Sequence, residues 1–343
     1  MTDINKAISS NEIKNGRSIV KTSINNIAAL LSNLTKTINL TDIQSKYDNK
    51  FDDENYYGNS GEASRNRYIA VAFGTNKIVS STDAIIWTEY DMPATRNWTG
   101  INYGNNVLLV CAYGSRYGAK TESSLDSIEE TDFLTSRNWQ AIIYGNEKFI
   151  ILADTTNVFV YSSDGDSFTE SNFPASATWK LGDYGNSTYV AMSYGSSISA
   201  TSTNGVSWTQ RSLPFSANWQ SVVYGNKFVA IARGTDRGIY SDNGINWTEM
   251  TLPRNQLWHN ITYGNGQYIA VAQNSQYIAV SSDGINWTER NVGLVAQWTS
   301  IVYGNGLFVI IGNGSIVATS PDGISWTQRA INSRNWYNMV STF

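Results

Sequence analysis

The spacing of the tryptophans constrains the fold of this chain more than any other feature. All twelve tryptophans fall into two columns. The first column, with intervals of 38 to 41 residues, is Trp98, Trp139, Trp179, Trp219, Trp258, Trp298 and Trp336. The second is Trp87, Trp208, Trp247, Trp287 and Trp326, with Phe168 and Glu130 in the two remaining places. Seven places in each column indicate seven copies of one repeat of about 40 residues.

Each copy reads as four short strands, a to d. Strand a ends in Tyr-Gly-Asn, as at residues 224–226, and Gly-Asn predicts a hairpin because both residues tolerate positive φ. Strand b is an apolar run such as 228–232, which is typical of a strand covered on both faces. Strand c, such as 277–280, precedes an Asp-Gly hairpin signal, and strand d begins at the second-column Trp. Repeated four-stranded units of this length are typical of a β-propeller.

The first and last copies are complementary fragments. The chain enters the repeats at 68–72, which reads as a strand b, whereas residues 336–343 contain only a strand a. We therefore predict an all-β, seven-bladed propeller over residues 65–343, in which the C-terminal strand pairs beside residues 68–73 and completes blade one. Such closure hides two strand edges that would otherwise invite aggregation.

Residues 1–64 do not repeat. Their apolar residues follow the 4-3-4-3-4 spacing of a heptad seam, at Val20, Ile24, Ile27, Leu31, Leu34 and Ile38. We predict a short N-terminal α-helical segment over residues 1–45 that docks or oligomerises, and β-branched residues at both seam positions favour a trimer. The alternative is an amphipathic helix that packs on its own propeller. Residues 46–64 read as a polar linker.

Charge and hydropathy exclude several partners. The chain has 24 Lys+Arg against 28 Asp+Glu, which gives no reason to expect nucleic acid as a partner. No run approaches the ~20 apolar residues of a membrane span, and the N-terminus lacks the apolar core of a signal peptide. We therefore expect synthesis in the host cytoplasm and no membrane insertion.

Cysteine and histidine are too rare for several kinds of site. Cys111 and His259 are the only residues of their types, so neither a disulfide nor a Cys/His metal site can form within one chain. We expect no metal and no cofactor. Cys111 lies in an apolar run and is interpreted as a buried hydrophobe. His259 follows a first-column Trp and is interpreted as a loop residue.

The segment between strands c and d resembles the Asp-box of sialidase-type propellers, Ser-x-Asp-x-Gly-x-x-Trp. Residues 281–287 and 320–326 carry it in a form that lacks one residue between Asp and Gly. Repeats of this kind look like those of phage tail and other virion-associated proteins. The resemblance implies a structural motif, in which the aspartate accepts hydrogen bonds from its own turn and the Trp fills the gap between blades. We expect this of Asp83, Asp164, Asp283 and Asp322.

Catalysis is not expected. A sialidase-type hydrolase needs an arginine cluster together with Tyr/Glu and Asp. The arginine signature of those enzymes is absent, and they have six blades. Glu89, Glu249 and Glu289 recur as features of the repeat. An acidic cluster replaces the Asp-box of the second copy and is interpreted as a solvated loop, at Glu122, Asp126, Glu129, Glu130 and Asp132.

The face that carries the d–a and b–c loops varies between copies, and variable loops on a rigid scaffold are where binding usually occurs. Trp, Arg and Asn together suit sugars. The predicted ligand-binding residues are Arg96, Trp98, Arg116, Tyr117, Arg137, Trp139, Arg237, Arg254, Arg334 and Trp336. The alternative for the first-column tryptophans is packing between blades.

Three functions remain open. The sequence favours a phage virion component, such as a tail fibre or surface protein. Its N-terminal segment would bind other virion proteins or trimerise, while its propeller would bind a host glycan or protein or act as a spacer. The second is a free carbohydrate-binding lectin. The third, least favoured, is a sialidase-like glycoside hydrolase.

Overall fold

A computed structural model describes residues 66–122 and 124–343. The helical segment, heptad seam and linker predicted for residues 1–64 lie outside the described residues. The described part is all-β apart from one 3-10 turn, η1, at Leu125–Ser127. No helix within it is long and apolar enough to span a bilayer.

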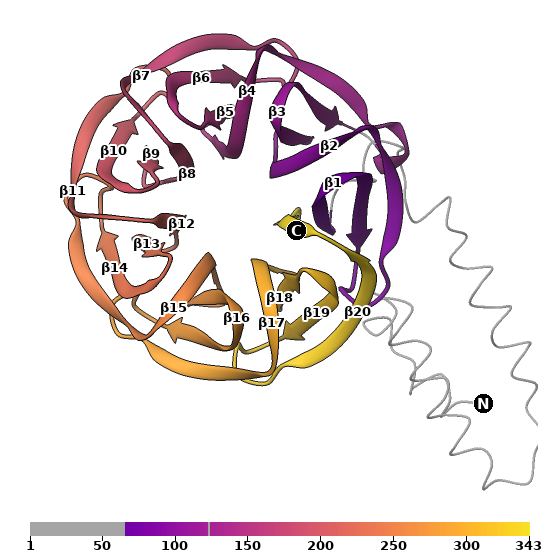
Figure 1. Ribbon diagram of the computed structural model, residues 1–343, viewed down its shortest axis with the longest axis vertical. Helices are drawn as coiled ribbons and strands as arrows, with labels where there is room; N and C mark the ends of the chain where they lie inside the picture. Colours follow the sequence, from indigo (N-terminus) through magenta and orange to yellow (C-terminus); the bar gives the residue numbers. More distant parts are fainter. Residues whose placement is uncertain (1–65, 123) are drawn as a thin grey trace, which may run out of the picture. The chain divides into compact units, whose positions relative to one another are not determined.

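The strands follow one another along the chain as β1 (Tyr68–Ser81), β2 (Thr88–Gly104), β3 (Val107–Thr121), β4 (Glu129–Gly145), β5 (Lys148–Ala153), β6 (Thr156–Ser162), β7 (Thr169–Ala177), β8 (Trp179–Gly185), β9 (Thr188–Ser193), β10 (Ser196–Ser202), β11 (Thr209–Ala217), β12 (Trp219–Tyr224), β13 (Phe228–Ala232), β14 (Thr235–Ser241), β15 (Thr248–Gly264), β16 (Gln267–Ser281), β17 (Thr288–Gly304), β18 (Leu307–Gly312), β19 (Gly314–Ser320), β20 (Thr327–Arg334) and β21 (Trp336–Ser341). Hydrogen bonds join them into sheets of order β21-β1-β2-β3-β4-β5-β6-β7, β11-β10-β9-β8 and β12 to β20. Figure 1 shows the sheets following one another around a central axis.

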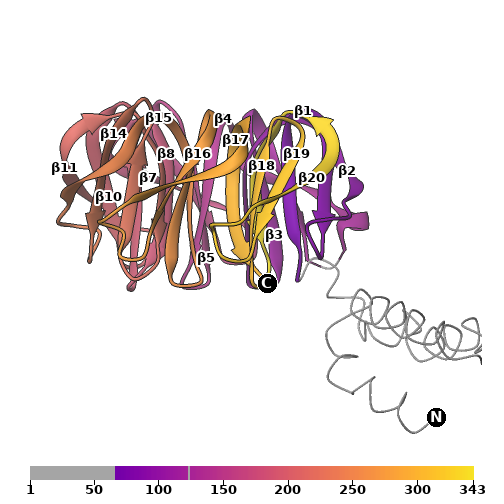
Figure 2. The ribbon, with the colours of Figure 1, turned by 90° about the horizontal axis from the view of Figure 1, so that it is seen from below.

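The longest strands each serve two repeats. The start of β2 pairs with the end of β1 through Val79↔Glu89, whereas its end pairs with β3 through Trp98↔Ala112. Strand d of one repeat thus runs directly into strand a of the next. Strand a lies nearest the axis, and Figure 2 shows the strands running from one face of the ring to the other.

The C-terminal strand pairs with the first strand, as predicted. β21 is antiparallel to β1 through Tyr68↔Ser341 and Ala70↔Met339. Beyond the ladder, the Thr342 amide donates to the Arg67 carbonyl at 2.9 Å, and the Arg67 amide donates to Thr342 Oγ1 at 2.9 Å. The chain therefore covers the inner edge of β1 with its own C-terminus.

Both tryptophan columns pack between consecutive repeats. One core cluster joins Val229 and Ile231 of β13 to Trp258 and Tyr268 of the following repeat, with Trp287 packed against it. Equivalent clusters occur at the other junctions, including one that joins β1 and β21 to β18. All seven first-column tryptophans are among the largest fully buried side chains. The interpretation of both columns as packing between repeats is confirmed.

The a–b turn uses its glycine differently from the sequence prediction. Asn146 and Glu147 take φ of 42° and 57°, so these two residues form the left-handed part of the hairpin, and Gly145 does not. A Cβ on Gly145 would instead overlap the ring of Tyr184 in the next repeat. The glycine is required because the neighbouring tyrosine crosses its Cα.

We expect Gly185→Ala to lower the free energy of unfolding by about 1–3 kcal/mol, because the added methyl would overlap Tyr224 Cγ. Denaturant titration measures the loss. In Gly185→Ala/Tyr224→Ala the overlap is gone, so the double variant should lose clearly less than the sum of the single losses. Additive losses would contradict this role of the glycine.

The register corrects the alignment of the second copy. Ala119 pairs with Glu130 as Val79 pairs with Glu89, so Glu130 corresponds to Glu89 and not to a tryptophan. Ile128 takes the place of Trp87, half-buried against the cluster of the preceding repeat. The turn containing η1 is one residue longer than its equivalents, and this shifted the sequence alignment.

Candidate functional site

The three tryptophans predicted to bind ligand are not available to one. Trp98, Trp139 and Trp336 are each 0% exposed. The indole of Trp98 donates to the Thr75 carbonyl at 2.9 Å, and that of Trp336 donates to the Asn332 carbonyl at 2.9 Å. A sugar cannot stack on a ring without exposed surface, so these residues contribute to packing.

Four of the predicted binding arginines form ion pairs across the junction to the next repeat. Each lies in a d–a connection and contacts a glutamate in the following strand d. The pairs are Arg96–Glu130, Arg137–Glu170, Arg254–Glu289 and Arg334–Glu89, at 2.5, 3.7, 2.7 and 2.8 Å. This recurring pair explains why these glutamates repeat along the sequence. Exposed pairs of this kind contribute about 0–1 kcal/mol each.

The other two arginines pair within their own repeat. Arg116 forms a bidentate contact with Asp132, at 2.7 and 2.6 Å, and this contact lowers the pKa of the Asp132 carboxyl. Arg237 contacts Glu249 at 2.8 Å. Every predicted arginine therefore already has a carboxylate partner.

Only one small group of the predicted residues comes together on the surface. The Arg96 guanidinium lies 5.6 Å from the ring centroid of Tyr117, and that of Arg116 lies 5.9 Å from it. Tyr117 is 38% exposed. The backbone of Arg137 pairs with Ser115 beside this group, but its guanidinium contacts Glu170 of the next repeat. Arg237, Arg254 and Arg334 lie in other repeats.

The shortened Asp-box is a turn held by its own side chains, as expected. Asp164 Oδ1 accepts from the amides of Asp166 and Ser167 at 2.9 and 2.8 Å and from Ser162 Oγ at 2.7 Å. These hydrogen bonds hold the pKa of Asp164 at about 2. Asn204 accepts the same two amide bonds in the next repeat, both at 2.9 Å.

Asp164→Ala is expected to lower the free energy of unfolding by about 1 kcal/mol at pH 7, because two turn amides lose their acceptor. Asp164→Asn should lose less, since asparagine fills this place naturally at Asn204. The folded pKa lies below the ordinary value, so the charge stabilises the fold above pH ~4 and the benefit is lost as the pH falls toward 2. Thermal melts from pH 7 to 2 measure this; a constant gap between wild type and Asp164→Asn would contradict it.

Two residues of the acidic cluster of the second copy, together with Asp166 of the next copy, contact one lysine. Lys120 Nζ lies 3.5 Å from Glu122, 3.4 Å from Glu129 and 3.4 Å from Asp166. The Lys120 side chain is only 7% exposed. Among residues 66–122 and 124–343, no group of three or more His, Cys, Asp and Glu is arranged to hold a metal ion. Glu122 and Glu129 thus balance the charge of Lys120, while Glu130 and Asp132 pair with Arg96 and Arg116.

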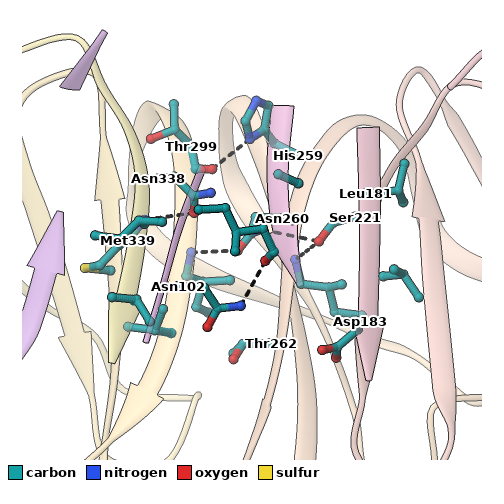
Figure 3. Close-up of a pocket in the computed structure, with 18 of the residues that line it drawn as sticks. Asn102, Leu181, Asp183, Ser221, His259, Asn260, Thr262, Thr299, Asn338 and Met339 are labelled. Atoms are coloured by element: carbon teal, nitrogen blue, oxygen red, sulfur yellow. Dashed lines mark hydrogen bonds between the residues drawn. The ribbon is translucent and has the colours of Figure 1, made fainter. Parts of the chain in front are cut away.

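A second candidate site, which the sequence reasoning missed, is a cavity of about 350 Å³ along the central axis. The inner strands of the repeats line it (Figure 3). These strands are sheet edges, so some of their backbone groups lack a ladder partner. Side chains of neighbouring repeats supply partners: Asn102 Nδ2 donates to the Ile142 carbonyl at 2.9 Å, and Asn260 Oδ1 accepts from the Ile301 amide at 3.0 Å. This explains why the channel is polar.

The ends of the cavity differ in charge. Toward one end lies Asp183, whose oxygens accept from the amides of Tyr184 and Tyr224 at 2.9 and 2.7 Å (Figure 3). Burial raises the pKa of Asp183 to about 6, and the two hydrogen bonds oppose that rise. At the end beside the first-column tryptophans, Lys180 Nζ lies 3.4 Å from Gln220 Oε1 and 4.6 Å from the ring centroid of Tyr194.

His259 lines the cavity at the Lys180 end. It lies in β15 and not in a loop, which corrects the sequence interpretation. Its Nδ1 lies 2.7 Å from the Thr299 carbonyl, so Nδ1 carries the proton and Nε2 is an acceptor. Burial, followed by the charges of Lys180 and Arg233, lowers the pKa of His259 to about 4, so the ring is neutral at pH 7. The sequence did contain a signal for this. His259 directly follows a first-column Trp, and the residue in that position lines the cavity in every repeat.

Cys111 is buried, as predicted, and burial raises the pKa of its thiol to about 12. The thiolate, which is the reactive form of cysteine, is therefore not populated at neutral pH.

Comparison with known proteins places the fold. No family model and no curated protein sequence matches the chain. Among solved structures, virginiamycin B lyase from Staphylococcus aureus, crystallised with quinupristin, is similar with a TM-score of 0.64 and 14% identity, over 73% of this chain and 93% of that one. YCF48 bound to a D1 peptide gives 0.57 and 13%, over 69% and 82%. AztD from Citrobacter koseri gives 0.57 and 10%, over 80% and 97%. The described part of the chain has a β-propeller fold.

Proposed function

We propose that the chain is a non-enzymatic binding or spacing component of a larger assembly, such as a phage tail fibre or particle surface. Its propeller has seven blades closed by β21, and its N-terminal helix docks on other virion proteins or trimerises. The main observation in favour of this proposal is that the repeated polar side chains bond to other groups of the propeller itself. The Arg–Glu pairs and the Asp-box hydrogen bonds hold repeats and turns together, which is the work of a scaffold.

The shortened Asp-box repeats support the virion assignment through their resemblance to virion-associated propellers. The YCF48 complex supports the binding role, since a propeller of similar fold can hold a peptide. The partner surface on this chain is the variable face around Arg96, Arg116 and Tyr117, where exposed aromatic area lies beside fixed guanidinium groups.

The mass of the full-length protein in solution tests the assembly role. Sedimentation equilibrium should give three times the chain mass, and Ile27→Asn/Leu31→Asn should give the single-chain mass because both positions lie in the seam. Ser32→Asn, off the seam, is the matched control and should remain a trimer. A wild-type protein that is monomeric and is found free rather than on particles would overturn this proposal.

A free lectin is the second candidate, favoured by the exposed Tyr117 ring between two arginines. A glycan array probed with the full-length protein should then show binding that Tyr117→Ala removes. Equal signals from both proteins would exclude this surface as the lectin site. Release of sialic acid from a sialoside would instead support the glycoside hydrolase.

A further inference from the structure

We propose that the Lys180 end of the central cavity binds the carboxylate of an acidic sugar, with Lys180 as the group that contacts it and Arg233 as a nearby cation outside the cavity lining. This goes beyond the proposed function, because the site lies inside the ring and does not require assembly. Lys180 directly follows the first-column Trp179 in β8, and the Arg233 amide donates to the Asn218 carbonyl at 2.9 Å, beside the first-column Trp of the next repeat, so both cations lie at the tryptophan end of the ring.

The first argument is unused donor capacity. An ammonium group has three donors, yet Lys180 Nζ has one long contact, 3.4 Å to Gln220 Oε1, and the face of the Tyr194 ring. Arg233 Nη1 donates to Gln273 Oε1 at 2.6 Å. In the described part of the chain neither cation forms an ion pair with a carboxylate, unlike the six arginines of the variable face.

The second argument is charge. Lys180 and Arg233 are close enough to repel each other, and this repulsion, after burial, lowers the pKa of Lys180. Both cations also depress the pKa of His259. A carboxylate bound to Lys180 in the cavity would offset this repulsion in a site partly screened from water, where charge-assisted hydrogen bonds are strongest.

Opposing charges are few. Asp154 attracts Lys180 and, like Arg233, lies outside the cavity lining; its Oδ2 contacts Gln140 Nε2 at 3.4 Å, so one carboxylate stands against the two cations. Asp183 lies toward the other end of the cavity, with both oxygens occupied by backbone amides. His259 is neutral at pH 7. The end of the cavity near Lys180 is therefore net positive.

The third argument is shape and apolar surface, which favour a sugar over a simple anion. The cavity of about 350 Å³ lies within the range of ligand pockets, roughly 300–1,000 Å³. The Tyr337 ring lines it, with its centroid 6.4 Å from that of His259. An aromatic face can pack against the C–H side of a pyranose, while His259 Nε2 accepts a hydrogen bond from a sugar hydroxyl.

Calorimetric titration of the full-length protein tests this with three probes: glucuronate, glucose and inorganic phosphate. We expect glucuronate to bind, glucose not to bind, and phosphate to bind more weakly than glucuronate. Lys180→Gln should weaken glucuronate binding by about tenfold or more, and Arg233→Gln should weaken it less. Lys180→Arg keeps the charge and should retain most of the affinity.

Lys148→Gln is the matched control. Lys148 also lies over a tyrosine ring, 5.8 Å from the centroid of Tyr161, but it donates to the Asn204 carbonyl near the a–b turn, outside the cavity. The affinity of Lys148→Gln for glucuronate should equal that of wild type. Melting temperatures show whether each variant is folded. The proposal is overturned if wild type does not bind glucuronate, if Lys180→Gln binds it as tightly as wild type, or if phosphate binds at least as tightly as glucuronate.

Discussion

Removal of residues 336–343 is expected to prevent the chain from folding into a stable monomer. The deletion takes away β21, so the inner edge of β1 loses its ladder at residues that are fully buried, such as Tyr68 and Ala70. It also takes Trp336 and Met339 out of the core cluster that joins β1 to β18. Truncating one buried Trp costs about 3–5 kcal/mol, which is comparable with the whole stability of many domains.

The truncated protein should appear mainly in the insoluble fraction, because an unpaired β1 edge with apolar neighbours invites association. Any soluble part should melt at least about 10 °C below wild type. Adding a synthetic peptide of residues 334–343 during refolding should restore solubility by supplying the missing strand. Deletion of Phe343 alone is the control, since this residue is 41% exposed and lies outside β21, although its ring packs on that of Tyr68 with centroids 5.0 Å apart. Unchanged solubility and melting temperature after the longer deletion would contradict the role of β21.

The sequence predicted the strand pattern and the C-terminal pairing because the repeat is dominated by burial and turn chemistry. Apolar runs and Asp-Gly turns act locally, so their signals survive in a single copy. The prediction failed where the cause lies in a neighbouring repeat. Nothing near Gly145 in the sequence shows that Tyr184 crosses it, and nothing near Glu130 shows that it pairs with Arg96.

The candidate site shows the same division. Arginines in variable loops are typical binding residues. The sequence could not show that three of them face a glutamate about 35 residues later, that Arg334 faces Glu89 at the start of the ring, and that the other two face a carboxylate in their own repeat. The channel was missed because its residues occupy ordinary strand positions. Lys180 and His259 line the same cavity only because their strands converge on the central axis in the folded protein. Periodicity identifies the residues that build the scaffold. The residues that differ between repeats at equivalent positions, such as Lys180 and His259, are the candidates for ligand contacts.

The first-column tryptophans provide the second large effect. Trp219→Ala is expected to lower the free energy of unfolding by about 3–5 kcal/mol, because Trp219 is fully buried between repeats and its indole donates to the Ser196 carbonyl at 3.0 Å. Trp247→Ala, in the half-buried second column, should cost less. Guanidinium titrations followed by circular dichroism give both values. Equal losses would contradict the distinction between the columns.

A finer comparison separates the hydrogen bond from the packing. Trp139 is as buried as Trp219 and also has a phenylalanine neighbour, but its indole nitrogen has no hydrogen-bond partner. Replacement by Phe removes similar volume at both positions, and at Trp219 it also leaves the half-buried Ser196 carbonyl without this donor. Trp219→Phe should therefore cost about 1 kcal/mol more than Trp139→Phe. Equal costs would mean that packing alone accounts for the stabilisation by this column, and a larger cost at Trp139 would contradict the argument.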